Sequence, residues 1–195
     1  MNGNKIPQTL NDLPRLHQMS IGSIAEIPEN HQMIKEAEFT RLYEQFAPGI
    51  LKLCKGYTGD NALAEDLLHE TFISVWNNMD KFRSDASWGT WIYRIGVNTC
   101  LSYFRKKKLS TIDIDYPAVE RVPHVNDDTE KNIQLLYKSI SRLEKTDRLI
   151  ISLVLEDKPY PDISAILGIT ENNLRVKIHR IKKQLTEIYN SYARL

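Results

Sequence analysis

A short unit near the end of the chain, from Tyr160 to Leu174, restricts the possible fold more than any other feature. Apolar residues recur there at the spacing of one helix face. Gly168 interrupts the pattern and suits the left-handed residue that follows a helix, and Thr170 can cap the next helix. The expected buried residues are Ile163, Ile166 and Leu167 in the first helix and Leu174, Ile178, Ile181 and Leu185 in the second. A helix, a turn containing glycine and a basic helix together predict a helix-turn-helix.

The polar side of the second helix carries the residues that we expect to meet DNA. In such a motif the N-terminal part of this helix normally enters the major groove. Arg and Asn side chains can form paired hydrogen bonds with guanine and adenine, each worth roughly 1–3 kcal/mol of discrimination. The candidates are Asn172, Asn173, Arg175, Lys177, His179, Arg180 and Lys183. A solvated basic face is the alternative, and the turn and the buried stripe favour DNA recognition over it.

The rest of the chain also follows helical spacing, and no strand pattern or internal repeat is present, so we predict an all-α fold. Pro48 fits the start of a helix, and Asp60 fits an N-cap. Before the helix-turn-helix, helices are expected at about residues 32–46, 48–56, 61–79, 88–108, 133–143 and 149–154. Residues expected on their apolar, inward faces include Ile73, Trp91, Ile92, Ile95, Thr99 and Ile133.

These helices are expected to form two small domains. Residues 1–30 have no steady period and several prolines, which is typical of a flexible leader. The first domain covers residues 31–108 and the second, with the helix-turn-helix, covers residues 130–195. Residues 109–129 contain two prolines and many acidic residues and no amphipathic period, so they are expected to be a flexible acidic linker.

Composition excludes several kinds of protein. The net charge of the 195 residues is only +1, but basic stretches lie on both sides of the acidic linker. Cys54 and Cys100 have no Cys or His nearby at metal-ligand spacing, and we expect them to be reduced and packed in a core. No apolar run is long enough for a signal peptide or a membrane span. We therefore expect a cytoplasmic protein with no cofactor, no metal and no membrane insertion.

Aromatic and basic residues follow one another in the helix expected at 88–108. Arg94, Asn98, Leu101 and Arg105 are spaced four, three and four residues apart and so lie on one face. Arg105 begins a run of four cations, which by itself is either a solvated cluster or a phosphate-binding site. Trp88, at the junction with the preceding loop, is the best candidate for a platform on which an unstacked base could lie. We interpret this segment as a surface for opened DNA.

An acidic group lies on the helix expected at 61–79. It consists of Glu65, Asp66 and Glu70, with His69 among them. The group is either an exposed helix face or a docking face for a basic partner. No nucleophile, phosphate-binding loop or metal-ligand set accompanies it, so the sequence carries no enzyme signature.

Three ordered motifs in the chain resemble the extracytoplasmic-function (ECF) family of RNA polymerase sigma factors. The segment from Asp66 to Phe72 resembles the core-binding part of region 2, and the segment from Phe82 to Thr99 resembles the promoter-melting and −10-reading part. The segments Tyr160–Gly168 and Leu174–Arg180 resemble the helix-turn-helix of region 4. The likeness extends over about residues 36–108 and 130–190.

The resemblance implies a function and a set of site residues. Core RNA polymerase would be bound through Asp66, His69 (where Gln is usual in the family) and Glu70. Region 2 would bind and melt the −10 element, and region 4 would read the −35 element through the helix after Thr170. The −10 residues would be Phe82, Trp88, Arg94, Asn98, Arg105 and Lys106. The implied partners are core RNA polymerase, promoter DNA and an anti-sigma factor.

Two other function classes stay open at this stage. A stand-alone helix-turn-helix regulator would also explain residues 130–195, but it would not need residues 36–108 to resemble a polymerase-docking module. An enzyme with a DNA-binding tail would need a ligand pocket in residues 36–108.

Overall fold

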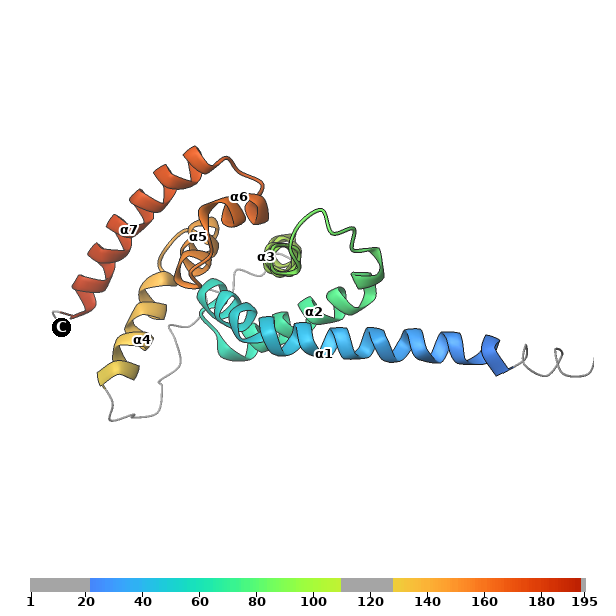
Figure 1. Cartoon of the computed structure of the whole chain (residues 1–195). Coiled ribbons are helices and arrows are strands. Elements are labelled where there is room, and N and C mark those ends of the chain that lie inside the picture. Colours follow the sequence, from blue (N-terminus) through green and yellow to red (C-terminus); the bar gives the residue numbers. More distant parts are fainter. Residues whose placement is uncertain (1–21, 110–127, 194–195) are drawn as a thin grey trace, which may run out of the picture. The chain divides into compact units, whose positions relative to one another are not determined.

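The computed structural model describes residues 22–109 and 128–193, and these are almost entirely helical with no strand among them (Figure 1). The prediction of an all-α fold is confirmed. The helices are α1 (Gly22–Thr58), α2 (Asn61–Asn78), α3 (Trp88–Leu109), α4 (Asp128–Ile140), α5 (Lys145–Leu155), α6 (Tyr160–Leu167) and α7 (Glu171–Ala193). A short 3-10 helix, Met79–Lys81, follows α2.

The chain divides into two units, residues 1–41 and residues 42–195. Within the first unit the structure describes only the part of α1 from Gly22 to Arg41. Most of the predicted leader and most of the predicted linker lie outside the described residues, so the flexibility of both stays a prediction. All contacts discussed below lie within the second unit.

Two sequence-based boundaries in α1 are wrong. The helix begins at Gly22, about ten residues before the expected start, because adding one residue to an existing helix costs much less than nucleating a new one. It also continues through Pro48 instead of ending there. Pro48 is exposed, so the carbonyl of Glu44 that loses its N–H partner can accept a hydrogen bond from water. A proline on the solvent side is therefore tolerated within this helix.

The turn between α1 and α2 agrees with its sequence. Gly59 has a positive φ of 70°, and its N–H donates to the Lys55 carbonyl at 2.9 Å, which closes α1. The Asp60 Oδ1 atom accepts a hydrogen bond from the Leu63 N–H at 2.8 Å. The predicted N-cap is confirmed. The cap stabilises the start of α2, on which the acidic group lies.

The C-terminal part of α1 packs with α2 and α3 around an apolar core. Its fully buried side chains include Ile50, Leu53, Cys54, Tyr57, Leu67, Ile92 and Cys100. Cys54 and Cys100 are free thiols, and their Sγ atoms lie 3.8 Å apart. The mutual hydrogen bond and burial raise the pKa of Cys100, so both thiols are packing groups, as predicted.

The buried face of α3 differs in part from the prediction. Ile92 is buried as expected, but Trp91, Ile95 and Thr99 are only half-buried. The positions that face the core are Tyr93, Gly96, Val97 and Cys100, one step further round the helix. Gly96 lies against Ile50 and Leu53 of α1, and an added Cβ atom would stand only 3.2 Å from the Ile50 Cδ1 atom. This close approach of two helices, which no local pattern reports, sets the rotation of α3.

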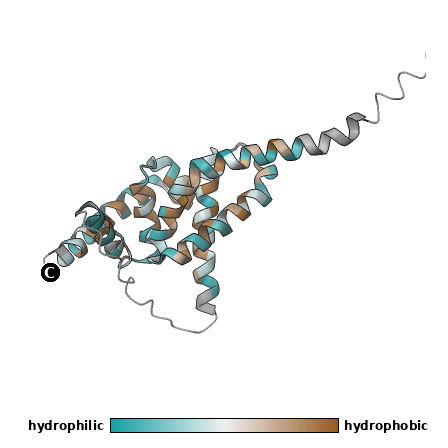
Figure 2. Cartoon of the chain, turned by 90° about the horizontal axis from the view of Figure 1, so that it is seen from below, coloured by the Kyte–Doolittle hydropathy of each residue, from teal (hydrophilic) through white to brown (hydrophobic). Residues whose placement is uncertain are grey.

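Helices α4 to α7 contain a second group of buried apolar residues. Figure 2 colours the residues of the chain by their hydropathy. The buried members include Ile140, Leu143, Leu149, Ile150, Leu153, Ile163, Ile166, Leu174, Ile178 and Ile181. Ile133 was expected in this group, but it lies near the start of α4 and is 49% exposed.

The helix-turn-helix prediction is confirmed in its local geometry. Gly168 has a φ of 67°, and its N–H donates to the Ser164 carbonyl at 2.8 Å. The Thr170 hydroxyl oxygen accepts a hydrogen bond from the Asn173 N–H at 3.4 Å and so caps α7. Helix α7 contacts α4, α5 and α6 through Leu174, Ile178 and Ile181 and their neighbours, which leaves its opposite side toward solvent.

Candidate nucleic-acid and polymerase interfaces

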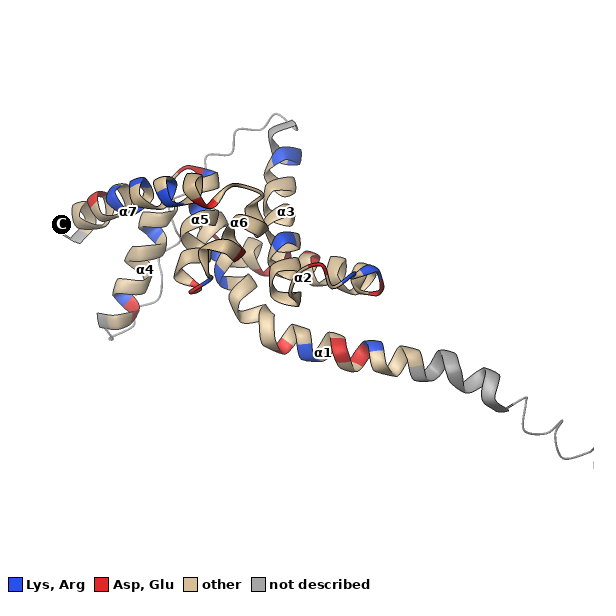
Figure 3. Ribbon diagram, turned by 45° about the horizontal axis from the view of Figure 1, so that its top comes forward, with Lys and Arg blue, Asp and Glu red and all other residues tan. Residues whose placement is uncertain are grey.

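One face of α7 lies directly opposite its buried residues. Asn172, Val176, His179 and Lys183 follow one another in steps of four, three and four residues, and all four are exposed. Asn173 and Arg180 are also exposed, beside this row. Figure 3 shows how Lys and Arg are distributed along the helix. We call the row from Asn172 to Lys183 the outer row of α7.

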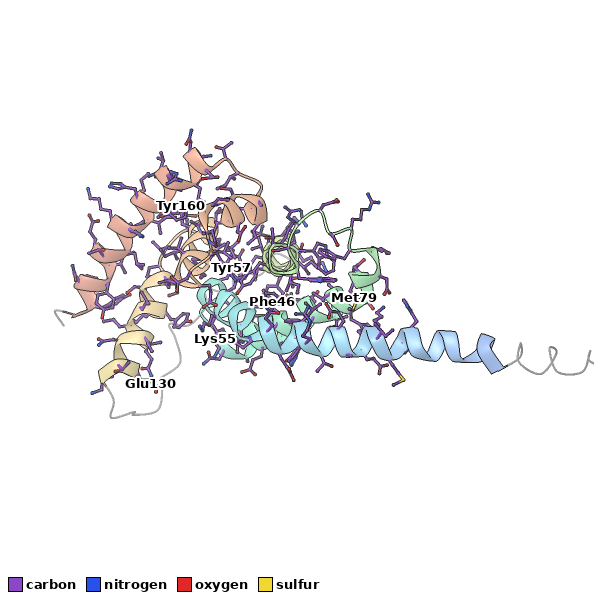
Figure 4. The ribbon with its side chains drawn as sticks, in the orientation of Figure 1. Phe46, Lys55, Tyr57, Met79, Glu130 and Tyr160 are labelled. Carbon is purple, nitrogen blue, oxygen red and sulfur yellow. The ribbon has the colours of Figure 1, made fainter. Side chains whose placement is uncertain are left out.

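Two of the expected DNA-binding cations lie at the sides of this row and have partners within the protein. The Arg175 Nη2 atom lies 3.3 Å from Glu171 Oε2, and its guanidinium lies over the ring of Tyr160, which is labelled in Figure 4. The Lys177 Nζ atom lies 4.0 Å from Asp147 Oδ1 of α5. Both cations therefore flank the outer row, a position that suits contacts to the DNA backbone.

The face of α3 predicted from residue spacing is present. Arg94, Asn98, Leu101 and Arg105 are all exposed, and Lys106 continues the cationic end. Arg105 also donates to the Ser102 hydroxyl at 3.2 Å. A helix face that is polar in the middle and cationic at its end can lie along a nucleic-acid backbone. We call Arg94, Asn98, Leu101 and Arg105 the α3 face.

An aromatic cluster lies where the loop enters α3. The Phe82 and Trp88 rings are stacked with centroids 3.7 Å apart, and the Trp91 ring lies against both. The Ser87 hydroxyl oxygen accepts a hydrogen bond from the Thr90 N–H at 3.0 Å, so it caps the helix. Phe82 and Trp88, which were predicted as separate DNA contacts, thus form one half-buried unit. One face of Trp88 is covered by Phe82.

The first helix of the helix-turn-helix contacts the α3 face. The Arg94 Nη2 atom donates to the Ala165 carbonyl of α6 at 2.6 Å, and α3 and α6 are in contact. This long-range contact was not expected from the sequence. It means that the guanidinium of Arg94 is engaged by another part of the protein in this arrangement.

Further polar contacts join the helices α1–α3 to the helices α4–α7. Lys52 of α1 pairs with Glu156, which follows α5, at 3.0 Å, and their hydrogen bond raises the pKa of Lys52. Arg148 of α5 donates to the carbonyl of Tyr57 at 3.1 Å. Burial raises the pKa of Tyr57 to about 12, so its phenol is neutral at physiological pH. Figure 4 labels Tyr57 within the side chains of this region.

The acidic group on α2 is exposed. Asp66, His69 and Glu70, the residues expected at polymerase, all face solvent, as does Glu65. Ile73 is 61% exposed and lies one turn beyond His69 and Glu70. The sequence had placed Ile73 on the apolar side with Phe72, but Phe72 alone is buried. An isoleucine is thus exposed beside carboxylates, and the seven-residue interval between Asp66 and Ile73 was the signal that could have revealed its exposure.

Other kinds of site find no support in the described part of the chain. Residues 22–109 and 128–193 contain no group of three or more His, Cys, Asp or Glu side chains that could hold a metal ion. Among the same residues, no helix has the length and apolar character needed to cross a membrane.

Two known families match the sequence. Sigma-70 region 2 matches residues 42–109, and Sigma-70, region 4 matches residues 133–185. The ECF RNA polymerase sigma-E factor of Salmonella typhimurium (strain 14028s / SGSC 2262) is 27% identical over 134 residues, which span 62% of this chain and 70% of that protein. The ECF RNA polymerase sigma factor SigW of Bacillus subtilis (strain 168) is 26% identical over 168 residues, which span 77% of this chain and 90% of that protein.

The fold is similar to that of a solved sigma factor. The sigma factor RpoE of Bartonella quintana, in a co-crystal with the anti-sigma factor NepR, aligns with a TM-score of 0.66 and 21% identity over 78% of this chain and 97% of that chain. The two matched families occupy the helices α1–α3 and α4–α7 in that order, and together they cover more than half of the chain. The chain therefore belongs to the ECF family of RNA polymerase sigma factors, which act in transcription initiation.

Proposed function

We propose that this sigma factor binds core RNA polymerase through α2 and directs it to promoters that have a −10 and a −35 element. The Phe82–Trp88 loop and the α3 face hold the opened −10 strand, and α7 reads the −35 duplex. The observation that carries the proposal is that α3 and α7 each present an exposed, cation-bearing row opposite their buried residues. Two such rows on separate helices suit two separate stretches of one promoter.

The two rows differ in a way that suits the α3 face to opened DNA and the outer row of α7 to duplex DNA. The α3 face adjoins an aromatic cluster, and aromatic rings can stack on unpaired bases. Asn98 lies at the middle of this face and can hydrogen-bond a base edge, while Arg105 and Lys106 suit phosphates. The outer row of α7 has no Phe, Tyr or Trp and belongs to a helix-turn-helix, which reads paired DNA.

The contact between Arg94 and Ala165 bears on how the protein acts. The Ala165 carbonyl occupies one N–H of the Arg94 guanidinium, and α6 lies in contact with α3, the helix that would hold the −10 strand. In this proposal α6 therefore separates from α3 when the protein joins core polymerase. The joining contacts include the ion pair of Lys52 with Glu156, the Lys158 ammonium over the Tyr93 ring and the packing of α3 on α6, and new contacts to polymerase and DNA would offset their loss.

An anti-sigma factor is the third proposed partner. The similar structure of RpoE from Bartonella quintana contains the anti-sigma factor NepR. By analogy, we propose a protein of that class as the inhibitor of this chain, and the cytoplasm, where polymerase and promoter DNA are found, as its location. A sigma factor has no active site of its own, and all residues proposed here act by binding.

A stand-alone helix-turn-helix regulator is the alternative function. It would use α4 to α7 but would have no need for an acidic face with an exposed Ile73 on α2. Size-exclusion chromatography of the full chain with core RNA polymerase distinguishes the sigma-factor function from the stand-alone regulator. Co-migration at one chain per polymerase is expected, and separate elution with both components intact would contradict the proposed function.

Replacement of Ile73 by Lys is expected to weaken binding to core polymerase by roughly thirtyfold. Ile73 is 61% exposed, so the change leaves the core of the protein intact. Loss of one buried isoleucine from an interface corresponds to about 2 kcal/mol. The measurement is a titration of labelled chain with core polymerase. Ile73→Val, which stays apolar, is the matched control and should bind almost normally; equal affinity of Ile73→Lys and the original chain would remove Ile73 from the interface.

A further inference from the structure

Val176 is an apolar residue in the middle of the polar outer row of α7. Its side chain is 61% exposed, and it lies between Asn172, four residues before it, and His179, three residues after it. Lys183 continues the row, and Arg175 and Arg180 flank it. An apolar group is thus held in water at the centre of the surface that carries the helix's cations.

Neither packing nor helix stability explains a valine at this position. The buried residues of α7, Leu174, Ile178 and Ile181, lie on the opposite side of the helix. A β-branched residue also lowers helix propensity relative to Ala, Lys or Arg, which would serve better at an exposed site. A contact made outside this chain would bury the side chain.

The chemistry of the surrounding residues identifies the ligand. The cations beside Val176 suit phosphates, and the outer row belongs to the second helix of a helix-turn-helix, which enters the major groove. Base edges in that groove carry hydrogen-bonding groups and a single apolar group, the C5 methyl of thymine. We propose that Val176 packs against the methyl group of a thymine in the −35 element and so helps to determine its sequence. This inference rests on the proposed reading of duplex DNA by α7.

The neighbours of Val176 add to its selectivity. Asn172 lies one turn before it on the same row and can bond an adenine edge, while the flanking cations fix the helix on the backbone. A cytosine at the same place carries only a hydrogen at C5, so it offers Val176 no methyl group to contact. Thymine is therefore favoured over cytosine by the apolar contact with its methyl group.

The test uses the full chain assembled with core RNA polymerase. Holoenzyme first selects −35 sequences from duplexes randomised upstream of a fixed −10 region. Each thymine of the selected element, on either strand, is then replaced by deoxyuridine, which removes only the C5 methyl. At one position the replacement is expected to weaken promoter binding by about fourfold, the effect of one buried methyl group.

Val176→Ala provides the second arm of the test. This variant should bind the thymine duplex about fourfold more weakly than the original chain and should show no further loss with deoxyuridine at that position. Ile133→Ala, which removes a similarly exposed apolar side chain from α4, is the matched control and should keep the full methyl effect. Melting temperatures of all three proteins verify that they are folded.

The outcomes separate the inference from the function on which it rests. A holoenzyme that selects no upstream sequence would contradict −35 reading by α7 itself. A holoenzyme that selects an element but responds to no thymine methyl, or whose Val176→Ala variant keeps the methyl effect, would overturn the role of Val176 and leave the proposed function intact.

Discussion

Replacement of Trp88 by Ala is expected to reduce promoter opening by at least tenfold while sparing the binding of duplex −35 DNA. The Trp88 ring stacks on Phe82 at 3.7 Å and stands at the entrance to α3, next to the α3 face. Stacking of a base on an aromatic side chain is worth about 1–3 kcal/mol, and this energy is needed to hold a base that has left the duplex. Reactivity of −10 thymines to permanganate measures the opening.

A control variant keeps a stacking surface at position 88. Trp88→Phe retains an aromatic ring beside Phe82 and should restore most of the opening. Trp88 is half-buried, so a melting curve must accompany each variant to separate loss of stacking from loss of folding. Normal permanganate reactivity in a folded Trp88→Ala holoenzyme would exclude Trp88 from strand opening.

Replacement of Gly56 by Ala is expected to separate the helix-turn-helix from α1–α3 in the free chain. Gly56 is buried, and an added Cβ atom would collide with the Ser152 hydroxyl of α5. Over-packing of this kind costs roughly 1–3 kcal/mol, whereas the same change within α1 improves helix propensity. The arrangement that holds Arg94 against Ala165 should therefore lose population by about tenfold or more.

The expected result is tighter binding of a single-stranded −10 oligonucleotide by the free variant, since Arg94 is released. Fluorescence anisotropy with the isolated full-length chain measures it. Ser152→Gly removes the colliding hydroxymethyl group, so the double variant should return to the original affinity. If Gly56→Ala leaves both the oligonucleotide affinity and the hydrogen exchange of α6 unchanged, the contact between α3 and α6 does not limit access to the α3 face.

Features that depend on neighbouring residues were predictable from the sequence. The cap at Asp60, the left-handed Gly168 and the cap at Thr170 each need only a few residues to form, and all three are present. The exposed alignment of Arg94, Asn98, Leu101 and Arg105 also follows from helical periodicity alone.

Features that depend on distant parts of the chain were not predictable. Pro48 began a new helix in the prediction, but its solvent-facing position, which is set by the packing of the rest of α1, makes it tolerable inside one continuous helix. The rotation of α3 depends on the close approach of Gly96 to Ile50 and Leu53. The bond between Arg94 and Ala165 joins residues 71 positions apart, and no local pattern signals it.

Exposed apolar residues were missed for a different reason. Ile73 was assigned to the inward side with its neighbour, and Val176 was passed over among polar residues. A sequence pattern treats apolar side chains as core by default, since most of them are. Only the exposed fraction of each side chain, 61% in both cases, separates these two from the core.

Transcription reconstituted from purified components tests the central claim most directly. Core RNA polymerase is supplied with fragmented genomic DNA, with and without the full chain, and the 5′ ends of the transcripts are sequenced. Starts that depend on the chain and share one upstream and one −10 sequence are predicted, with Trp88→Ala reducing their yield and Val176→Ala changing the upstream preference. Transcripts whose starts are the same with and without the chain, under conditions where both proteins are intact, would contradict the account.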